Sequence, residues 1–411
     1  MERRLLGVLE PGIGFAAGTE CNRRWVAMKE YLMTAGPTPV PERILQAMSG
    51  PMLYHRAPAF TECLNETSEG LRWLFQTRSP VLQLAGSGTA AMDASVANFL
   101  SKGDRALVVR GGKFGERWGK ICQAYGVECT FIDVEWGKSV DPQAVKEALD
   151  KDPTIRAVYA TASETSTGAR HDLEGIAKLT RTRENVILCV DAVTAIGVFD
   201  VPMDDWGLDV VCLGSQKALM LPPGLAMIAV SDKAWGFNAT STLPRFYLDL
   251  MRERKSQERG ETAFTPAVSL VAGLRESLRM LREETLEGVW ARHDRLAKAT
   301  RSAAGGLGLE LFSSSPTNAV TAIRVPGGID GTAVVRTMRA RYGITIAGGQ
   351  DHLKGKIVRI AHIGYFSEFD IVTAISGLEM TLSDLGYGIK PGSGVAAAQA
   401  SFAQTSARAV F

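Results

Sequence analysis

A lysine and an aspartate each follow an apolar run of the kind that forms a buried strand. Lys217 comes shortly after residues 210–213, and Asp191 comes directly after residues 186–190. Partial removal from water lowers the pKa of an amine, so Lys217 is a candidate nucleophile for Schiff-base formation with a carbonyl group. The simpler alternatives are a solvated loop lysine and a carboxylate that caps the following helix.

The turn Gly86-Ser87-Gly88-Thr89 lies between an apolar run at residues 81–85 and an alanine-rich segment. This order predicts a strand, a glycine turn and a helix. Because the N–H groups at a helix start carry partial positive charge, a phosphate group would bind well at Gly88 and Thr89. The turn also loosely matches the dinucleotide fingerprint, with Arg110 available for the extra phosphate of NADP, so an NADP-binding oxidoreductase stays open.

These three features together meet the needs of pyridoxal phosphate. The aspartate would keep the pyridine nitrogen protonated, the lysine would form an imine with the aldehyde, and the glycine turn would hold the phosphate. A further candidate is Arg359, which lies within the apolar run at residues 357–361. A strand arginine among apolar neighbours needs an anion, so it indicates either a clamp for a substrate carboxylate or an internal salt bridge.

Strand and helix candidates alternate between residues 81 and 230. The alternation predicts an α/β fold in which helices cover both faces of a mainly parallel sheet. Ligands in such folds bind beyond the carboxyl ends of the strands, so the glycine turn, the 164–168 turn and Asp191 should converge on one crevice. A long helix with leucines at helical spacing then leads to a smaller α+β domain. We expect an N-terminal extension at residues 1–30 and a large domain at residues 31–285, with an N-terminal arm at the substrate entrance. A small domain at residues 286–389 and a disordered tail at residues 390–411 should follow.

The composition excludes several classes of function. The chain has 411 residues and a net charge of +2 with no extended basic face, so nucleic acid is not an expected partner. No apolar run approaches the roughly 20 residues that span a bilayer, and the six cysteines contain no C-x-x-C pair, which together favour the cytoplasm. The five histidines show no spacing typical of a metal site. The first residues are expected to form a mobile arm or to precede a true start at Met28.

On its motifs the chain resembles the class V, fold-type I aminotransferases, and within them the serine/alanine–glyoxylate aminotransferase group. The similarity covers about residues 33–385. Its most specific motifs are Thr34-Ala35-Gly36-Pro37-Thr38-Pro39-Val40-Pro41, Ser87-Gly88-Thr89, Glu164-Thr165-Ser166-Thr167-Gly168, Asp191-Ala192-Val193, Gly214-Ser215-Gln216-Lys217-Ala218 and Pro222-Pro223-Gly224. The resemblance implies a seven-stranded type of sheet in the large domain, pyridoxal phosphate as the cofactor, and a homodimer with active sites at the subunit interface.

The resemblance also implies a role for each site residue. Lys217 would form the Schiff base and Asp191 would pair with the pyridine nitrogen. Arg359 would bind the substrate carboxylate, with Gly36 of the N-terminal arm and Thr165 beside the substrate. The implied cofactor contacts are Ser87, Gly88, Thr89, Phe114, Thr165, Asp191, Val193, Gln216 and Lys217, joined by Thr262 and Thr265 from the neighbouring subunit.

The implied reaction is a ping-pong transamination from serine or alanine to glyoxylate or a similar 2-oxo acid. An aspartate or 2-aminoethylphosphonate transaminase is the alternative within the family, while a desulfurase would need a mobile cysteine that no obvious flexible loop of the sequence provides. Three further alternatives stay open: a subunit associated with another enzyme, a non-catalytic scaffold and the NADP-binding oxidoreductase.

Overall fold

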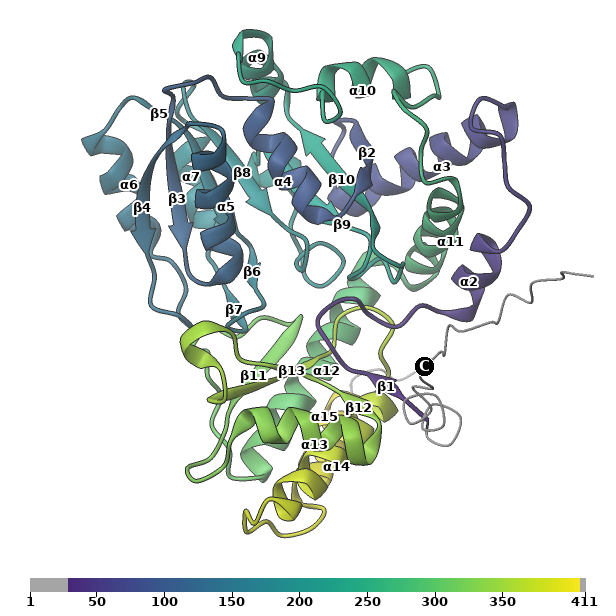
Figure 1. Ribbon diagram of the computed structural model, residues 1–411, viewed down its shortest axis with the longest axis vertical. Coiled ribbons are helices and arrows are strands. Elements are labelled where there is room, and N and C mark those ends of the chain that lie inside the picture. The colour runs from purple at the N-terminus through teal and green to yellow at the C-terminus, as the bar shows by residue number, and fades with distance from the viewer. Residues whose placement is uncertain (1–28, 407–411) are drawn as a thin grey trace, which may run out of the picture.

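A seven-stranded sheet in the order β2-β10-β9-β8-β5-β3-β4 forms the centre of the larger part of the molecule (Figure 1). The computed structural model describes residues 29–406, so the predictions for residues 1–28, including a start at Met28, and for residues 407–411 lie outside the described residues. The strands of the sheet are β2 Val81–Gly86, β10 Gly224–Val230, β9 Val210–Gly214, β8 Ile187–Asp191, β5 Ile155–Thr161, β3 Arg105–Arg110 and β4 Glu128–Asp133. A separate hairpin pairs β6 Ser163–Glu164 with β7 Ala169–Arg170.

The directions of the strands decide which loops can meet. Strands β4, β3, β5, β8 and β9 are parallel to one another, and β10 runs antiparallel to both β9 and β2. β2 therefore points the same way as the parallel strands, and the carboxyl ends of all the strands except β10 meet at one edge of the sheet. The predicted α/β fold with a mainly parallel sheet is confirmed.

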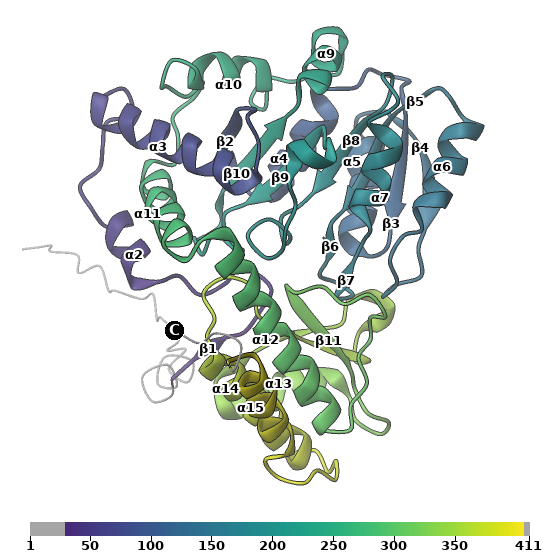
Figure 2. The ribbon, with the colours of Figure 1, turned by 180° about the vertical axis from the view of Figure 1, so that it is seen from behind.

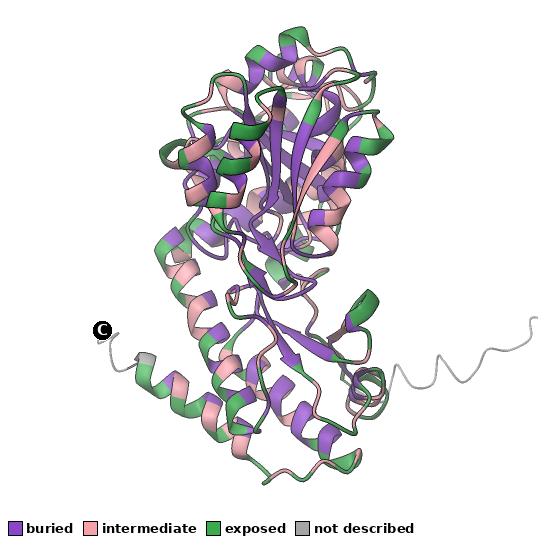
Figure 3. Ribbon diagram, turned by 90° about the vertical axis from the view of Figure 1, so that its left-hand side faces the viewer, coloured by how far each residue is buried: buried purple, intermediate pink, exposed green. Residues whose placement is uncertain are grey.

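Each strand of the sheet contributes to two hydrophobic cores, because successive side chains point to opposite faces. In β8, Leu188 and Val190 belong to the core on one face, while Ile187 and Cys189 belong to the core on the other face. All four side chains are fully buried, as expected for a strand that is covered on both sides. Figure 3 shows the sheet as the buried centre of this part of the molecule.

Helices cover both faces of the sheet. Helices α4 and α5 pack on one face, and helices α3, α6, α7 and α11 pack on the other (Figures 1 and 2). The helices of this part are α2 Glu42–Met48, α3 Pro58–Phe75, α4 Gly88–Ala97, α5 Lys113–Ala124, α6 Pro142–Lys151, α7 Leu173–Thr180, α8 Met203–Trp206, α9 Asp232–Thr240, α10 Leu250–Gln257 and α11 Val268–Glu284. Helices α4 and α5 both begin at the edge where the strands end, so their N–H groups face the same place as the strand-end residues.

The smaller part of the molecule follows α11 and combines an antiparallel sheet with helices (Figure 2). Its three-stranded sheet has the order β11-β14-β13. The elements are α12 Leu286–Gly306, β11 Val320–Arg324, α13 Gly331–Tyr342, β12 Ile344–Thr345, β13 Ala347–Gly348, the short 3-10 helix Asp351–Leu353, β14 Ile357–Ala361, α14 Glu368–Asp384 and α15 Ser393–Ser406. The leucine stripe predicted for the preceding helix is found in α11, where Leu274, Leu278 and Leu281 are buried.

The prediction of a disordered tail from residue 390 is wrong for the residues that form α15. This helix packs along α12, where a side-chain carbon added at Gly306 would lie 2.7 Å from the Cβ atom of Ala397. Ala398 is fully buried, and Phe402 is 6% exposed. The segment is rich in alanine because only small side chains allow the two helices to approach so closely.

The predicted large domain also begins too early. Residues Tyr31–Leu32 form β1, which pairs in parallel with β12 of the smaller part. The backbone carbonyl of Met33 then accepts a hydrogen bond from the N–H of Ala361 at 3.1 Å. The N-terminal arm therefore starts on the smaller part and crosses to the larger part afterwards.

Candidate active site

Lys217 and Asp191 follow neighbouring parallel strands at the same edge of the sheet. Asp191 is the last residue of β8, and Lys217 comes three residues after the end of β9. In the pairing of the two strands Asp191 lies opposite Cys212 of β9. The carboxylate and the amine are close enough for each to change the pKa of the other. The structure thus brings together the two residues on which the sequence interpretation depended.

The Lys217 amine is buried, with 9% of the residue exposed. Burial lowers its pKa to about 8, and the positive charges of Arg359 and Arg117 act in the same direction, while Asp191 opposes the change. The amine donates a hydrogen bond to the backbone carbonyl of Ala35 in the N-terminal arm. The neutral, nucleophilic form is therefore far more abundant near neutral pH than it is for an ordinary lysine, although the protonated form still predominates below pH 8.

Asp191 is a buried carboxyl group with a raised pKa. Desolvation is the main cause, and it is opposed by the hydrogen bond that Oδ1 accepts from the N–H of Val193 at 2.9 Å and by the positive charges of Arg117 and Lys217. A buried carboxylate is stable when a positively charged donor faces it. The site is therefore suited to a protonated ring nitrogen beside Asp191.

The glycine turn begins α4, as predicted. Ser87 is the N-cap residue, but its side chain makes no capping hydrogen bond, so the N–H groups of Gly88 and Thr89 are left for another acceptor, while that of Ala90 donates to the carbonyl of Ser87 at 2.7 Å. A side-chain carbon added at Gly88 would lie 2.7 Å from Cγ2 of Val193, so the turn lies directly against the segment that follows Asp191. Any larger residue at position 88 would push these two segments apart.

The same turn does not form a dinucleotide-binding unit. In that unit the strand before the glycines is joined through a helix to an adjacent parallel strand. Here β2 lies at the edge of the sheet, and its one neighbour, β10, is antiparallel to it. The NADP alternative therefore lacks the strand arrangement on which the fingerprint depends.

Phe114 is held at the site by Glu164, whose importance the sequence interpretation missed. Oε2 of Glu164 accepts the N–H groups of Phe114 and Gly115, each at 3.0 Å, at the start of α5. Its other oxygen accepts the N–H of Ser166 at 3.2 Å and the hydroxyl of Ser166. The glutamate is fully buried, and desolvation raises its pKa. The sequence signal that could have identified Glu164 as a site residue was its position in the same motif as Thr165.

Arg359 is a buried guanidinium without a carboxylate partner. It donates from Nη1 to the carbonyl of Thr165 at 2.6 Å and from Nε to the carbonyl of Gly348 at 2.9 Å. Among residues 29–406 no carboxylate forms an ion pair with it, although the charge of Glu164 raises its pKa. Burial has the larger effect and lowers the pKa to about 10. Arg359 therefore forms no internal salt bridge within residues 29–406, and its remaining N–H groups are available to an anion.

The remaining predicted residues divide into two groups. Gln216 precedes Lys217, and its side-chain oxygen is buried without a hydrogen-bond partner among the described residues. Thr262 instead donates its hydroxyl to the carbonyl of Phe264 at 2.7 Å, and Thr265 is exposed. No hydrogen bond of the described residues joins either threonine to Lys217 or Asp191, so their predicted role in a neighbouring subunit stays a prediction.

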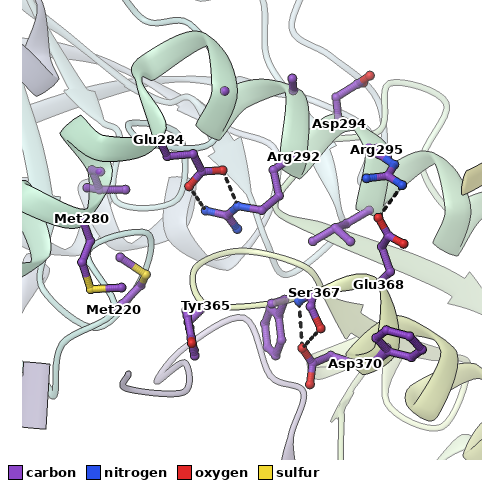
Figure 4. A pocket seen from close by; sticks show the side chains of 16 residues that line it. Met220, Met280, Glu284, Arg292, Asp294, Arg295, Tyr365, Ser367, Glu368 and Asp370 are labelled. Carbon is purple, nitrogen blue, oxygen red and sulfur yellow. Dashed lines mark hydrogen bonds and ion pairs between the residues drawn. The ribbon is translucent and has the colours of Figure 1, made fainter. Parts of the chain in front are cut away.

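A cavity of about 1260 Å³ lies apart from this cluster, between α11, α12 and the start of α14 (Figure 4). Two ion pairs line it, Arg292 with Glu284 at 2.6 Å and Arg295 with Glu368. None of the predicted site residues contributes to its lining. Size alone therefore does not identify the reactive site, and we assign the chemistry to the strand-end cluster.

A sequence model of the family described as aminotransferase class-V matches residues 30–364, which include both Asp191 and Lys217. The chain belongs to the class-V aminotransferases. This aminotransferase is 46% identical over 375 residues to the soluble hydrogenase small subunit of Synechococcus sp. (strain PCC 6716), a match that covers 90% of this chain and 97% of that protein. It is 37% identical over 381 residues to the L-aspartate–glyoxylate aminotransferase of Paracoccus denitrificans (strain Pd 1222), with 91% and 96% covered.

A solved structure agrees with the sequence comparisons. The ureidoglycine–glyoxylate aminotransferase (pucG) of Bacillus subtilis superposes with a TM-score of 0.88 at 33% identity, and the match covers 91% of this chain and 98% of that one. The predicted family and the fold of type I pyridoxal-phosphate aminotransferases are confirmed. The aminotransferase is thus a pyridoxal-phosphate-dependent enzyme.

The residues present fit pyridoxal phosphate. The start of α4 at Gly88 and Thr89, which has no side-chain cap, and the buried pair of amine and carboxyl group match an anionic, aromatic aldehyde. Among the described residues no group of three or more histidine, cysteine, aspartate or glutamate side chains could hold a metal ion. None of the helices within residues 29–406 has the length and apolar character needed to cross a bilayer.

Proposed function

We propose that this aminotransferase transfers the amino group of a small amino acid, serine or alanine, to glyoxylate, which gives a 2-oxo acid and glycine. The observation that carries the proposal is Arg359, a buried guanidinium near Lys217 that has no carboxylate partner among the described residues. One such cation suits a donor with one carboxylate. Glyoxylate as the acceptor is supported by two of the similar proteins, which are named as glyoxylate aminotransferases.

Each of the strand-end residues would have one task in this reaction. Bound pyridoxal phosphate supplies the aldehyde that takes the amino group and the ring that takes up the electron pair left on Cα. Lys217 would hold the cofactor through its aldehyde and, as a neutral amine, would take the proton from Cα of the donor. Asp191 would hold a proton on the ring nitrogen. Arg359 would bind the donor carboxylate and so fix the direction of the Cα–H bond.

The phosphate and the ring would be held by the segments around the strand ends. Gly88 and Thr89 at the start of α4, together with Ser87 and Gln216, would hold the phosphate. Phe114 and Val193 would enclose the ring, and Thr165 would contact the ring hydroxyl. Gly36 would lie beside the substrate.

The proposed enzyme is a homodimer in the cytoplasm. Thr262 and Thr265 would reach the phosphate of the neighbouring subunit, because within their own chain they take no part in the strand-end cluster. Removal of the hydroxyl by Thr262→Val should weaken cofactor binding only if the two chains share their sites. Mixed dimers of Thr262→Val and Lys217→Ala chains would test this, since one of their two sites would keep both residues.

Aspartate is the second candidate for the donor, because the Paracoccus relative is an L-aspartate–glyoxylate aminotransferase and is 37% identical to this chain. An aspartate donor would bring a second carboxylate and would need a second cation.

A panel of donors and acceptors tests the proposal. Purified enzyme is incubated with serine, alanine, aspartate or 2-aminoethylphosphonate together with glyoxylate or pyruvate, and the new amino acid is measured by chromatography. We expect the highest kcat/KM with serine or alanine and glyoxylate. A higher kcat/KM with aspartate favours the second candidate, and no product from any pair would contradict both.

Variants of Arg359 show whether it binds the donor carboxylate. In Arg359→Met the KM for the donor should rise by at least about tenfold, and Arg359→Lys should fall between this variant and the unchanged enzyme. Arg324→Met is the matched control, because Arg324 lies on the neighbouring strand β11 with half of its side chain exposed. An unchanged donor KM in Arg359→Met would count against the clamp.

A further inference from the structure

Arg117 lies on α5 one helical turn after Phe114, and it contacts two of the proposed cofactor-binding segments at once. Its Nη1 donates a hydrogen bond to the hydroxyl oxygen of Thr89 at 3.0 Å. Its guanidinium carbon lies 4.8 Å from the centre of the Phe114 ring. Residues three apart on a helix share one face, so the guanidinium can contact the aromatic ring and Thr89 of α4 at the same time.

The positive charge of Arg117 is not neutralised by a nearby carboxylate. Among residues 29–406 no aspartate or glutamate forms an ion pair with it. By contrast, Lys113 and Arg110, which flank the start of the same helix, are paired with Glu116 and with Asp133. The charge of Arg117 therefore acts on the site itself, where it favours the ionised form of Asp191 and the neutral form of Lys217.

We propose that Arg117 is a positioning residue for the cofactor, which ties the phosphate-binding turn at Thr89 to the ring-stacking residue Phe114. Helices α4 and α5 are separate segments, and this hydrogen bond joins the first turn of α4 to the second turn of α5 at the place where the phosphate and the ring would meet. The inference rests on the proposed contacts of Thr89 and Phe114 with pyridoxal phosphate. It does not depend on which amino acid is the donor.

The arrangement explains why an arginine stands at this position. A guanidinium has several N–H donors in one plane, so it can bind the Thr89 hydroxyl at one corner while its flat face lies over an aromatic ring. A lysine has the charge but no planar group, so it should preserve the electrostatic effect and lose the fixed geometry.

Cofactor binding by the apoenzyme tests the inference without any substrate. Apoenzyme of Arg117→Met, Arg117→Lys and Thr89→Val is titrated with pyridoxal phosphate, the dissociation constant is measured by quenching of tryptophan fluorescence, and the bound cofactor is recorded by visible circular dichroism. We expect the dissociation constant to rise by about tenfold or more in Arg117→Met and by less in Arg117→Lys. The circular dichroism of the bound cofactor should change in Arg117→Met, because the ring is no longer fixed.

The double variant Arg117→Met/Thr89→Val shows whether the two residues act together on the cofactor or independently of each other. If the arginine positions Thr89, the losses of affinity in Arg117→Met and Thr89→Val should not add up in the combined variant. Lys120→Met is the matched control, since Lys120 is exposed on the same helix and its removal should leave the dissociation constant unchanged. Should Arg117→Met lose its helical circular dichroism, Arg117→Lys and Thr89→Val decide by the same titration.

The outcomes are distinct from those of the donor panel. A dissociation constant within about twofold of the unchanged enzyme, or additive losses in the double variant, overturns the positioning role. Failure of serine and alanine as donors leaves the titration unaffected. An error in the proposed donor and an error in this inference therefore give different results.

Discussion

Lys217 donates a hydrogen bond to the backbone carbonyl of Ala35, which lies 182 positions earlier in the sequence. The N-terminal arm is fixed there by Thr38, whose N–H donates to the carbonyl of Gln216 at 3.2 Å and whose hydroxyl donates to the carbonyl of Lys217 at 3.1 Å. The arm therefore covers the reactive amine and is attached to the backbone that carries it. The amine must leave the carbonyl of Ala35 before it can react.

Substitution of Gly36 by alanine should disable the enzyme. The residue has a φ of +118°, and a side-chain carbon there would overlap the amine of Lys217 and lie 2.6 Å from its Cδ atom. We expect kcat/KM to fall at least about tenfold and the free energy of unfolding to fall by about 1–3 kcal/mol. Activity assays and urea unfolding measure the two effects.

The control for this substitution is Gly386→Ala. Gly386 also has a positive φ, +86°, but no atom of residues 29–406 lies within 4 Å of an added side-chain carbon. It should therefore lose stability with little effect on kcat/KM. Equal activity in the Gly36 and Gly386 variants would show that the arm does not restrict Lys217.

The reactivity of Lys217 in the apoenzyme should change around pH 8. An ordinary lysine has a pKa near 10.5, whereas burial lowers that of Lys217 to about 8, so below this pH the amine is protonated and above it the amine is a nucleophile. Reductive methylation of the apoenzyme at a series of pH values, followed by peptide mass spectrometry, gives the rate for each lysine. The rate at Lys217 should reach its half-maximum near pH 8.

Lys120 provides an internal control in the same samples, because it is exposed on α5. If the rate at Lys217 showed no half-maximum near pH 8, the proposal that burial activates this amine would be wrong.

Glu164→Gln should destabilise the enzyme and disturb the ring site. The buried carboxylate accepts the N–H groups of Phe114 and Gly115, and an amide cannot accept on both sides of the group. It also removes a negative charge from the start of α5. We expect the free energy of unfolding to fall by about 1–2 kcal/mol, measured by urea unfolding.

Glu287→Gln is the matched control for Glu164→Gln. Glu287 lies in the first turn of α12 but is exposed, so its substitution should change the free energy of unfolding by less than about 0.5 kcal/mol. The two variants together separate the effect of charge at a helix start from that of a buried hydrogen-bonded carboxylate. Equal losses would remove the special role assigned to Glu164.

The parts of the site that the sequence could predict are those determined by local pattern. Apolar runs that end in Asp191 and Lys217 form parallel strands, and parallel strands place their last residues at one edge whatever the remaining contacts are. The glycine turn at Gly88 could be found for the same reason, because a strand, a glycine pair and a helix follow one another in the chain. These features need no knowledge of distant residues.

The parts that could not be predicted depend on neighbours far apart in the sequence. Glu164 acts on α5, about fifty positions earlier in the chain, and Arg117 acts through Thr89 of another helix. Nothing in the spacing of these residues distinguishes them from surface charges. Strand β10 is antiparallel to both of its neighbours, β2 and β9, and this direction likewise follows from packing and not from the apolar composition of the strand.

The start of helix α15 is bound by Glu379, a contact that the composition of the segment does not predict. Glu379 of α14 is 7% exposed, and its carboxylate accepts the N–H groups of Gly392, Gly394 and Val395 at 3.1, 2.6 and 3.2 Å. These are unpaired donors at the start of α15, so Glu379 caps that helix from outside it. In Glu379→Ala the free energy of unfolding should fall by about 1–3 kcal/mol.

Hydrogen exchange shows whether this loss arises at α15. Because the cap is gone, the amides of residues 393–406 should exchange faster in Glu379→Ala, while those of the central sheet should keep their protection. Glu310→Ala is the control, since the side chain of Glu310 is 83% exposed and its substitution should change neither measurement. Fast exchange of residues 393–406 already in the unchanged enzyme would mean that the segment is a free tail in solution, as its alanine-rich and serine-rich composition suggested.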